Sequence, residues 1–198
     1  MNEQFGECTP HSGQNCASAI ILTTKRLILR CPHAEDSHAI TQIANNRRIA
    51  EQTRRMPHPY SIADAERWIE MMVTGEECTF LVTRKGDDKI LGATGCGSMD
   101  ENEKEIGFWI GEPFWAFGYA TEAAQAIIDH IFATQQLEQL YGRCRVTNTP
   151  SRRVLMKCGF QFAGSGMCDS AVLSGPVPVE VFALERSVWA SLKRWGAR

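Results

Sequence analysis

The sequence has no long apolar run, and no stretch approaches the roughly 20 residues that a membrane-spanning helix needs. Residues 1–22 also lack the charged start and apolar middle of a secretory signal, so a cytoplasmic location is expected. The chain also lacks a large excess of charge of one sign, because its formal net charge at pH 7 is -2. This argues against a nucleic-acid-binding protein driven by bulk charge, and neither a membrane nor a nucleic acid is an expected partner.

Closely paired cysteines are missing too. The chain has eight cysteines, but no two have the CxxC spacing of zinc sites and redox motifs. Their scatter predicts buried or free thiols rather than a disulfide framework. Cys8, His11 and Cys16 lie close together, but no second pair follows them, so they are interpreted as part of a polar tail. No metal is expected.

Two common nucleotide-binding motifs do not occur. A Rossmann unit would have GxGxxG after its first strand, with an acidic residue about 20 residues further on. A P-loop would have GxxxxGK[ST]. The sequence contains neither pattern, so a cofactor site of either type is not predicted.

What the chain does have is enough length and apolar content for one folded domain: 198 residues, 43% of them hydrophobic. Residues 1–22 are rich in Gly, Ser, Asn and Gln and are predicted to form a flexible N-terminal tail. Residues 23–187 are predicted to form the domain. Residues 188–198 are predicted to form a C-terminal tail.

Hydrophobic periodicity predicts the order β-α-α-β-β-β-α-β-α-β-β, which is a mixed α/β domain. Four helices are expected, the second between Asp64 as N-cap and a stop at Gly75. The Gly/Pro-rich segment 164–178 is predicted as a loop between the last two strands. The other helices are expected near residues 36–46, 121–134 and 151–157, and the strands near residues 27–31, 79–83, 90–96, 105–110, 140–146, 160–163 and 179–184.

The segment 105–124, EIGFWIGEPFWAFGYATEAA, is the most informative part of the chain. It predicts a strand, a short turn, a loop of small residues and a helix whose first turn contains Glu122. The first N–H groups of a helix have no partner within the helix, and the helix dipole adds partial positive charge there. Ala116, Gly118 and Ala120 keep this loop thin, so its main chain can approach a phosphate. A phosphorylated cofactor is therefore expected.

Four motifs together resemble the GNAT superfamily of N-acetyltransferases, and among its branches the RimJ/RimL-type enzymes, which acetylate N-terminal amines of ribosomal proteins. The motifs are KRLILR at residues 25–30, EIGFWI at 105–110, GYATEA at 118–123 and NTPSRRVLMKCGF at 148–160. The resemblance implies a GNAT fold. In that fold a mostly antiparallel, twisted sheet of six or seven strands is splayed between its fourth and fifth strands and carries about four helices.

The resemblance also implies how acetyl-CoA would be bound. Backbone groups of Phe108, Trp109 and Ile110 would pair with the pantetheine arm like an added strand. Asn148 would contact this arm or fix the local backbone. The pyrophosphate would be held by the backbone N–H groups of Ala116, Phe117, Gly118, Tyr119, Ala120 and Thr121. Many relatives have glycine at the first of these six positions.

At the expected catalytic position this chain departs from the family. Many members donate a proton to the leaving thiolate from a tyrosine at the position where this chain has Leu155. Ser151 is the predicted substitute, and the alternative is an ordinary helix N-cap. Glu105 is the predicted general base, and the alternative is a solvated charge at a strand end. Asp169 and Glu180 are further carboxylates that could face the acceptor.

The resemblance implies an enzyme that transfers an acetyl group from acetyl-CoA to a primary amine, such as the N-terminal amine of a protein. Two alternatives stay open: transfer to a small amine such as a polyamine or an aminoglycoside, and a CoA-binding sensor without catalysis. The identity of the acceptor and the oligomeric state, a homodimer included, also stay open. A basic cluster is interpreted as a solvated face rather than a docking site, and consists of Arg47, Arg48, Arg54 and Arg55.

Overall fold

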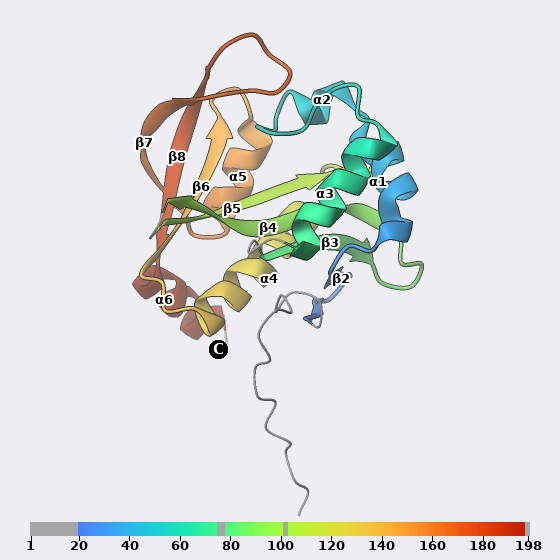
Figure 1. The fold of residues 1–198 in the computed structure, drawn as a ribbon. Helices are drawn as coiled ribbons and strands as arrows, with labels where there is room; N and C mark the ends of the chain where they lie inside the picture. The colour runs from blue at the N-terminus through green and yellow to red at the C-terminus, as the bar shows by residue number, and fades with distance from the viewer. Residues whose placement is uncertain (1–19, 75–77, 101–102, 197–198) are drawn as a thin grey trace, which may run out of the picture.

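The computed structural model describes residues 20–74, 78–100 and 103–196 (Figure 1). Most of the predicted N-terminal tail and the predicted helix stop at Gly75 lie outside these residues. The described elements comprise six α-helices: α1 (Ser37–Ala44), α2 (Arg47–Ala50), α3 (Ile62–Thr74), α4 (Tyr119–Thr134), α5 (Thr149–Lys157) and α6 (Arg186–Gly196). They also comprise eight strands: β1 (Leu22–Thr23), β2 (Leu27–Arg30), β3 (Cys78–Arg84), β4 (Ile90–Asp100), β5 (Glu103–Ile110), β6 (Gln139–Arg145), β7 (Gln161–Cys168) and β8 (Val177–Glu185).

All eight strands form one sheet in the order β1-β2-β3-β4-β5-β6-β8-β7. Every neighbouring pair is antiparallel except β5 and β6, which run parallel. The long helix α4 connects these two parallel strands, as a parallel crossover requires. The predicted mixed α/β class and the mostly antiparallel sheet are confirmed, although the sheet has one or two strands more than expected.

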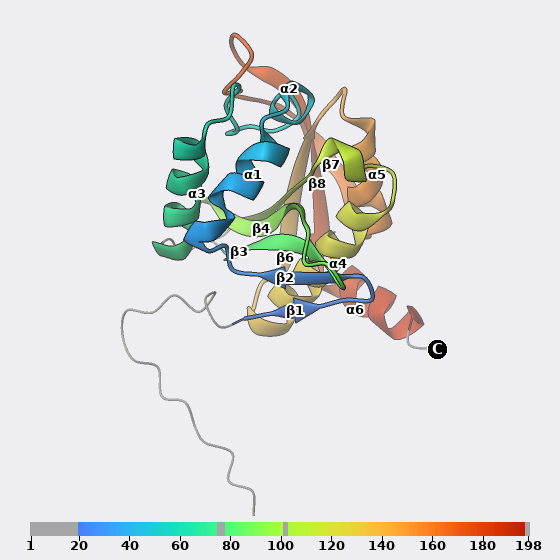
Figure 2. The same cartoon turned by 90° about the vertical axis from the view of Figure 1, so that its right-hand side faces the viewer.

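Helices cover both faces of this sheet. Figure 2 shows α1 and α3 on one side and α4 and α5 on the other. The α4 side holds the larger core, in which Ile127 and Ile131 of α4 pack against β-strand residues such as Leu29 and Phe80. The other side holds a smaller core around Ile40 of α1, with Trp109 packed against it. The sheet is therefore buried on both faces over its central strands.

The helix starts differ from the predictions in two places, for the same reason. Before α3, Ser61 and Asp64 bond each other reciprocally: the Ser61 N–H donates to Asp64 Oδ2 at 2.9 Å, and the Asp64 N–H lies 3.3 Å from Ser61 Oγ. Ser61 is thus the N-cap, and Asp64 is the N3 residue of a capping box. At α5, Asn148 is the N-cap and Ser151 lies inside the first turn, so the predicted N-cap at Ser151 is wrong. In both cases a second capping residue stands three positions before the predicted one.

The segment 164–178 is not simply a loop. Residues 164–168 continue β7, and residues 177–178 begin β8. β7 is an edge strand whose side chains are mostly exposed, so it shows no apolar alternation that a sequence pattern could reveal. Gly164, with a φ of 155°, lies where the β7–β8 register shifts, which is a usual place for glycine in a strand.

Residues 188–196, predicted as part of a C-terminal tail, belong to helix α6. Trp189 packs on Phe132 of α4, with ring centroids 5.1 Å apart, and its Nε1 donates to Asp129 Oδ1 at 2.8 Å. Arg186 donates from Nη1 to the Phe132 carbonyl at 2.8 Å and from Nε to the Leu137 carbonyl at 2.7 Å. These contacts fix α6 to the end of α4. None of the described helices, α6 included, is long and apolar enough to cross a membrane.

Candidate active site

The parallel strands β5 and β6 are joined for only a short distance. Their register pairs only Glu105 with Tyr141 and Ile106 with Gly142 within the described strands. Beyond these pairs the two strands diverge, so the edge of β5 that faces β6 stays open for an extended ligand. The predicted splay between the fourth and fifth strands of the sequence-based order, which are β5 and β6, is confirmed.

A cavity of about 860 Å³ occupies this divergence and extends under α3. Strand alternation places Glu105, Gly107 and Trp109 on the sheet face that carries α1 and α3, because Trp109 packs in the core of that face. A Cβ at Gly107 would meet no atom within 4 Å, so this glycine leaves part of the floor open. The residues from the splayed strands and from the start of α5, its N-cap included, that line the cavity are Glu105, Ile106, Gly107, Phe108, Trp109, Arg143, Cys144, Arg145, Asn148 and Ser151.

The loop between β5 and α4 has the shape of an anion cradle. Ala116 and Gly118 both have left-handed backbone conformations, with φ of 66° and 81°, and Gly118 is the N-cap of α4. No side chain caps this helix start, so the N–H groups of its first turn are available to a ligand. These donors and the helix dipole fit a pyrophosphate. The six predicted loop residues, 116–121, lie here, outside the cavity lining.

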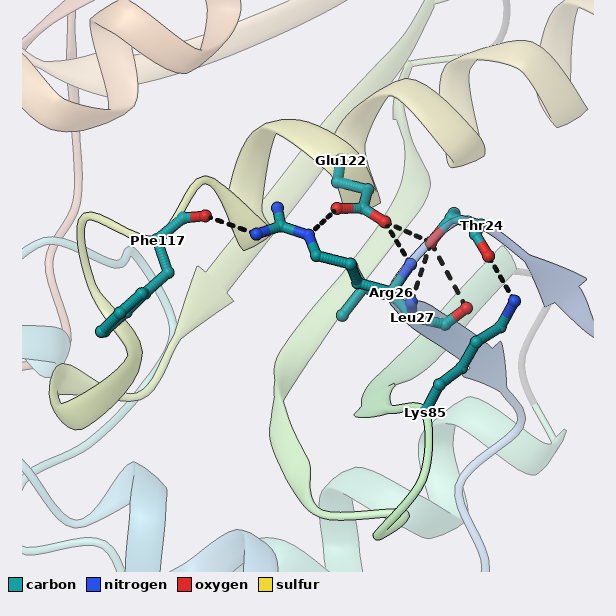
Figure 3. Close-up of polar contacts among 6 residues, drawn as sticks. All are labelled: Thr24, Arg26, Leu27, Lys85, Phe117 and Glu122. Carbon is teal, nitrogen blue, oxygen red and sulfur yellow. Dashed lines mark hydrogen bonds and ion pairs between the residues drawn. The ribbon is translucent and has the colours of Figure 1, made fainter.

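A polar network ties the start of α4 to the turn between β1 and β2 (Figure 3). Glu122 accepts hydrogen bonds from Thr24 Oγ1 at 2.6 Å, from the Arg26 N–H at 2.8 Å and from Arg26 Nε at 2.7 Å. Arg26 also donates from Nη1 to the Phe117 carbonyl at 2.9 Å, and its guanidinium lies 4.6 Å from the centre of the Tyr119 ring. One side chain thus holds both the loop and the first helical turn.

A second set of contacts holds the other end of the loop. Glu112 accepts a hydrogen bond from Asn46 Nδ2 at 2.6 Å and forms an ion pair with Arg48. The Arg48 guanidinium lies 5.1 Å from the centre of the Trp115 ring, and Trp115 Nε1 donates to the Ile110 carbonyl at 2.5 Å. The basic residue Arg48, interpreted from sequence as part of a solvated face, therefore has a partner in the loop.

Asn148 and Ser151 lie together at the start of α5 and border the cavity. Asn148 is buried, and its Oδ1 accepts from the Ser151 N–H at 3.1 Å, so this side chain fixes the local backbone. Because Asn148 serves as the cap, the Ser151 hydroxyl is not needed for capping. Leu155 lies one turn further on, is 1% exposed and packs beneath Gly142 of β6. It belongs to the core and leaves Ser151 as the hydroxyl that α5 contributes to the cavity lining.

The predicted carboxylates differ in their surroundings. Glu105 stands at the apex of the splay, where β5 and β6 still pair, and its Oε2 lies 3.6 Å from Arg143 Nε. Its side chain is 21% exposed and borders the cavity. Asp169 also lines the cavity. Glu180 accepts two hydrogen bonds from Arg152, at 2.6 and 2.7 Å, and does not line the cavity.

Comparison with known proteins agrees with this geometry. A family model described as an acetyltransferase (GNAT) domain matches residues 26–161, which is more than half of the chain. The chain belongs to the GNAT acetyltransferase family. The identification made from the four sequence motifs is thereby confirmed, and the protein is an acyltransferase by family.

Its relatives include an uncharacterized N-acetyltransferase and a ribosomal-protein acetyltransferase. This GNAT protein is 28% identical over 149 residues to the uncharacterized N-acetyltransferase p20 of Bacillus licheniformis, a match that covers 72% of this chain and 83% of p20. It is 30% identical over 80 residues to the ribosomal-protein-serine acetyltransferase of Escherichia coli (strain K12), covering 39% of this chain and 45% of that enzyme. Its fold resembles that of Mycobacterium smegmatis RimJ, solved with CoA-disulfide, at a TM-score of 0.71 and 20% identity, covering 86% and 89% of the two chains.

Sequence reasoning missed the arginines that line the cavity of this GNAT protein. Arg143 and Arg145 lie in β6, where their alternation with Gly142 and Cys144 is only part of an ordinary strand pattern. Arg54, assigned from sequence to a solvated face, also lines the cavity. The strand alternation could have predicted that Arg143 and Arg145 share one face of the sheet. It could not have predicted that this face borders a cavity.

Proposed function

We propose that this protein transfers the acetyl group of acetyl-CoA to a primary amine, and that a protein N-terminus is the first acceptor to test. The observation that carries the proposal is the open edge of β5, which leads from the loop at the start of α4 into the cavity between β5 and β6. The names of the relatives support it, since one acetylates a ribosomal protein and another was solved with a CoA derivative.

In this proposal the main chain holds the donor. Phe108, Trp109 and Ile110 pair with the pantetheine arm along the open edge of β5. The N–H groups of residues 116–121 bind the pyrophosphate, helped by the partial positive charge at the start of α4. Because Ala116 and Gly118 are left-handed, the backbone N–H groups of this loop turn out of a regular strand or helix path and are free for the phosphates.

Three groups of the chain serve the chemistry in this proposal. An amine is mostly protonated at neutral pH, since an α-amine has a pKa of about 8, so it must lose a proton before it attacks the thioester. Glu105 accepts that proton, directly or through a water molecule. Backbone N–H groups of the splayed β5 stabilise the negative charge that develops on the carbonyl oxygen. The Ser151 hydroxyl donates a hydrogen bond or a proton to the CoA sulfur as the C–S bond breaks.

A direct test combines acetyl-CoA with a panel of amines and follows the release of free thiol. Binding of CoA is measured separately by calorimetry. Thiol release that depends on both the amine and the protein supports the proposal. Tight CoA binding without thiol release for any amine would overturn the transfer reaction and favour the CoA-binding sensor.

A further inference from the structure

The lining of the cavity is rich in arginine. Two of the loops that contribute to it meet, because the Ala171 N–H donates to the Arg54 carbonyl at 3.0 Å. Residues that line the cavity include more arginines than carboxylates, so the formal charge of the lining is positive at neutral pH. The arginines are Arg54, Arg55, Arg67, Arg143 and Arg145, and the carboxylates are Asp64, Glu105 and Asp169.

Two of the three carboxylates are engaged by neighbouring side chains. The Ser61 hydroxyl donates to Asp64 Oδ2 at 2.6 Å, which holds the pKa of Asp64 below its ordinary value, and Arg67 Nη1 lies 3.4 Å from Asp64 Oδ1. Glu105 lies beside Arg143. Each of these two carboxylates already has an arginine beside it, so neither favours a cationic group of the acceptor.

Arg143 and Arg145 each have an unused Nε donor on the same side of β6, whereas Arg145 Nη1 donates to the Glu51 carbonyl. They are two residues apart in the strand, so both side chains leave the same face of the sheet. The Nε atoms of both are buried and have no hydrogen-bond partner among the described residues. The 3.6 Å between Arg143 Nε and Glu105 is too long for a hydrogen bond. A buried charged donor without an acceptor is unfavourable, so a ligand that accepts from it gains affinity.

We propose that the acceptor amine carries an anionic group, a carboxylate or a phosphate, and that Arg143 and Arg145 bind this group. The inference rests on the proposed function and names the acceptor class of the same site. A guanidinium binds such oxyanions through paired hydrogen bonds. An anion held by Arg143 brings the amine of the same molecule next to Glu105, 3.6 Å away. Polycations such as polyamines and aminoglycosides are disfavoured by the same positive charge.

The experiment uses matched acceptors that differ only in the anionic group. The pairs are a peptide with Glu or Gln after its free N-terminal residue, an amino acid and its amide, and ethanolamine phosphate and ethanolamine. Thiol release is followed at saturating acetyl-CoA. We expect kcat/KM to be at least about tenfold higher for the anionic member of the preferred pair, the effect of one charge-assisted hydrogen bond. The pair with the largest ratio identifies the source of the anion.

Variants assign the selectivity to the two arginines. Arg143→Gln and Arg145→Gln should each move the ratio between matched acceptors toward one. The ratio is the readout because Arg143→Gln also removes a neighbour of Glu105 and can change the absolute rate. Arg194→Gln is the matched control, since Arg194 is exposed and lies in α6, at the opposite end of the molecule from α2 (Figure 1). It should leave the ratio unchanged.

Equal kcat/KM for all matched members, or an unchanged ratio in both cavity variants, would overturn the inference. The same pairs are also titrated by calorimetry into the protein saturated with CoA. This measurement decides the inference even if no amine is acetylated, which would be the failure of the proposed function alone. Tighter binding of the anionic members supports the inference, whereas equal binding or no binding by any member overturns it.

Discussion

Glu122 and Arg26 form a two-point contact across 96 residues of sequence: one carboxylate oxygen accepts the backbone N–H of Arg26, and the other accepts its Nε. Thr24 adds a third hydrogen bond to the same carboxylate (Figure 3). Because Arg26 also donates to the Phe117 carbonyl, the contact links the turn before β2 to the loop proposed to bind the pyrophosphate. The loop is therefore held in shape before any ligand arrives.

Glu122→Gln should weaken donor binding more than it disturbs the fold. The amide keeps the size of the side chain but loses its charge and can accept at only one oxygen, so the grip on Arg26 and Thr24 is reduced. We expect the Kd of acetyl-CoA to rise about tenfold, which corresponds to about 1.4 kcal/mol. The free energy of unfolding should fall by about 1–2 kcal/mol.

Calorimetry and urea unfolding measure the two effects. Glu35→Gln is a suitable control, because the Glu35 side chain is 85% exposed and lies in another part of the chain. It should change neither quantity. An unchanged Kd in Glu122→Gln would mean that the network does not support the proposed phosphate loop.

The same contact predicts a loss of stability in acid. Burial alone would raise the pKa of Glu122, but its hydrogen bonds from Thr24 and Arg26 outweigh burial and lower the pKa below 4.5. A carboxyl group whose pKa is lower in the folded state stabilises the fold above its unfolded pKa. This contribution is lost as the pH falls through the folded value. Unfolding free energies measured from pH 6 down to pH 3 should therefore decline less steeply in Glu122→Gln than in the wild type, and equal slopes would contradict the assignment.

Much of the fold could be predicted because its signals are local. The alternation of Leu27 and Leu29, the spacing of Ile127 and Ile131, and the glycine at the start of α4 each act within a few residues of sequence. The splay was predicted from the resemblance and not from such signals. Since β6 follows β5 only after a helix of 16 residues, their short register depends on contacts that no local pattern contains.

The rest depends on contacts between distant residues. The link from Arg26 to Glu122 joins two ordinary charged residues, and each alone looks like a solvated side chain. Arg143 and Arg145 gain their significance from a cavity that six or more segments of the chain enclose. The start of α5 was misassigned because Asn148 and Ser151 are both good caps, and only the backbone path decides between them.

Ser151→Ala and Asn148→Ala should separate catalysis from helix capping. Removing the Ser151 hydroxyl should lower kcat at least about a hundredfold, the low end of the effect of a positioned proton donor, with little change in acetyl-CoA affinity. The melting temperature of Ser151→Ala should stay near that of the wild type, because Asn148 is the cap. Asn148→Ala should instead cost about 1 kcal/mol of stability. Equal loss of kcat and of affinity in Ser151→Ala would point to a structural role for the hydroxyl.

The same substitution at two glycines on neighbouring strands should affect different properties, stability at one and acceptor binding at the other. A Cβ at Gly142 would lie 2.6 Å from Leu155 Cδ2 in the core, so Gly142→Val should destabilise the protein by about 2 kcal/mol or more. A Cβ at Gly107 would meet nothing within 4 Å and would point to the cavity on the α3 side. Gly107→Val should therefore keep the melting temperature and the CoA affinity while raising the KM of the acceptor. If Gly107→Val instead weakened CoA binding and left the acceptor KM unchanged, the acceptor would not enter from the face that carries Glu105 and Trp109.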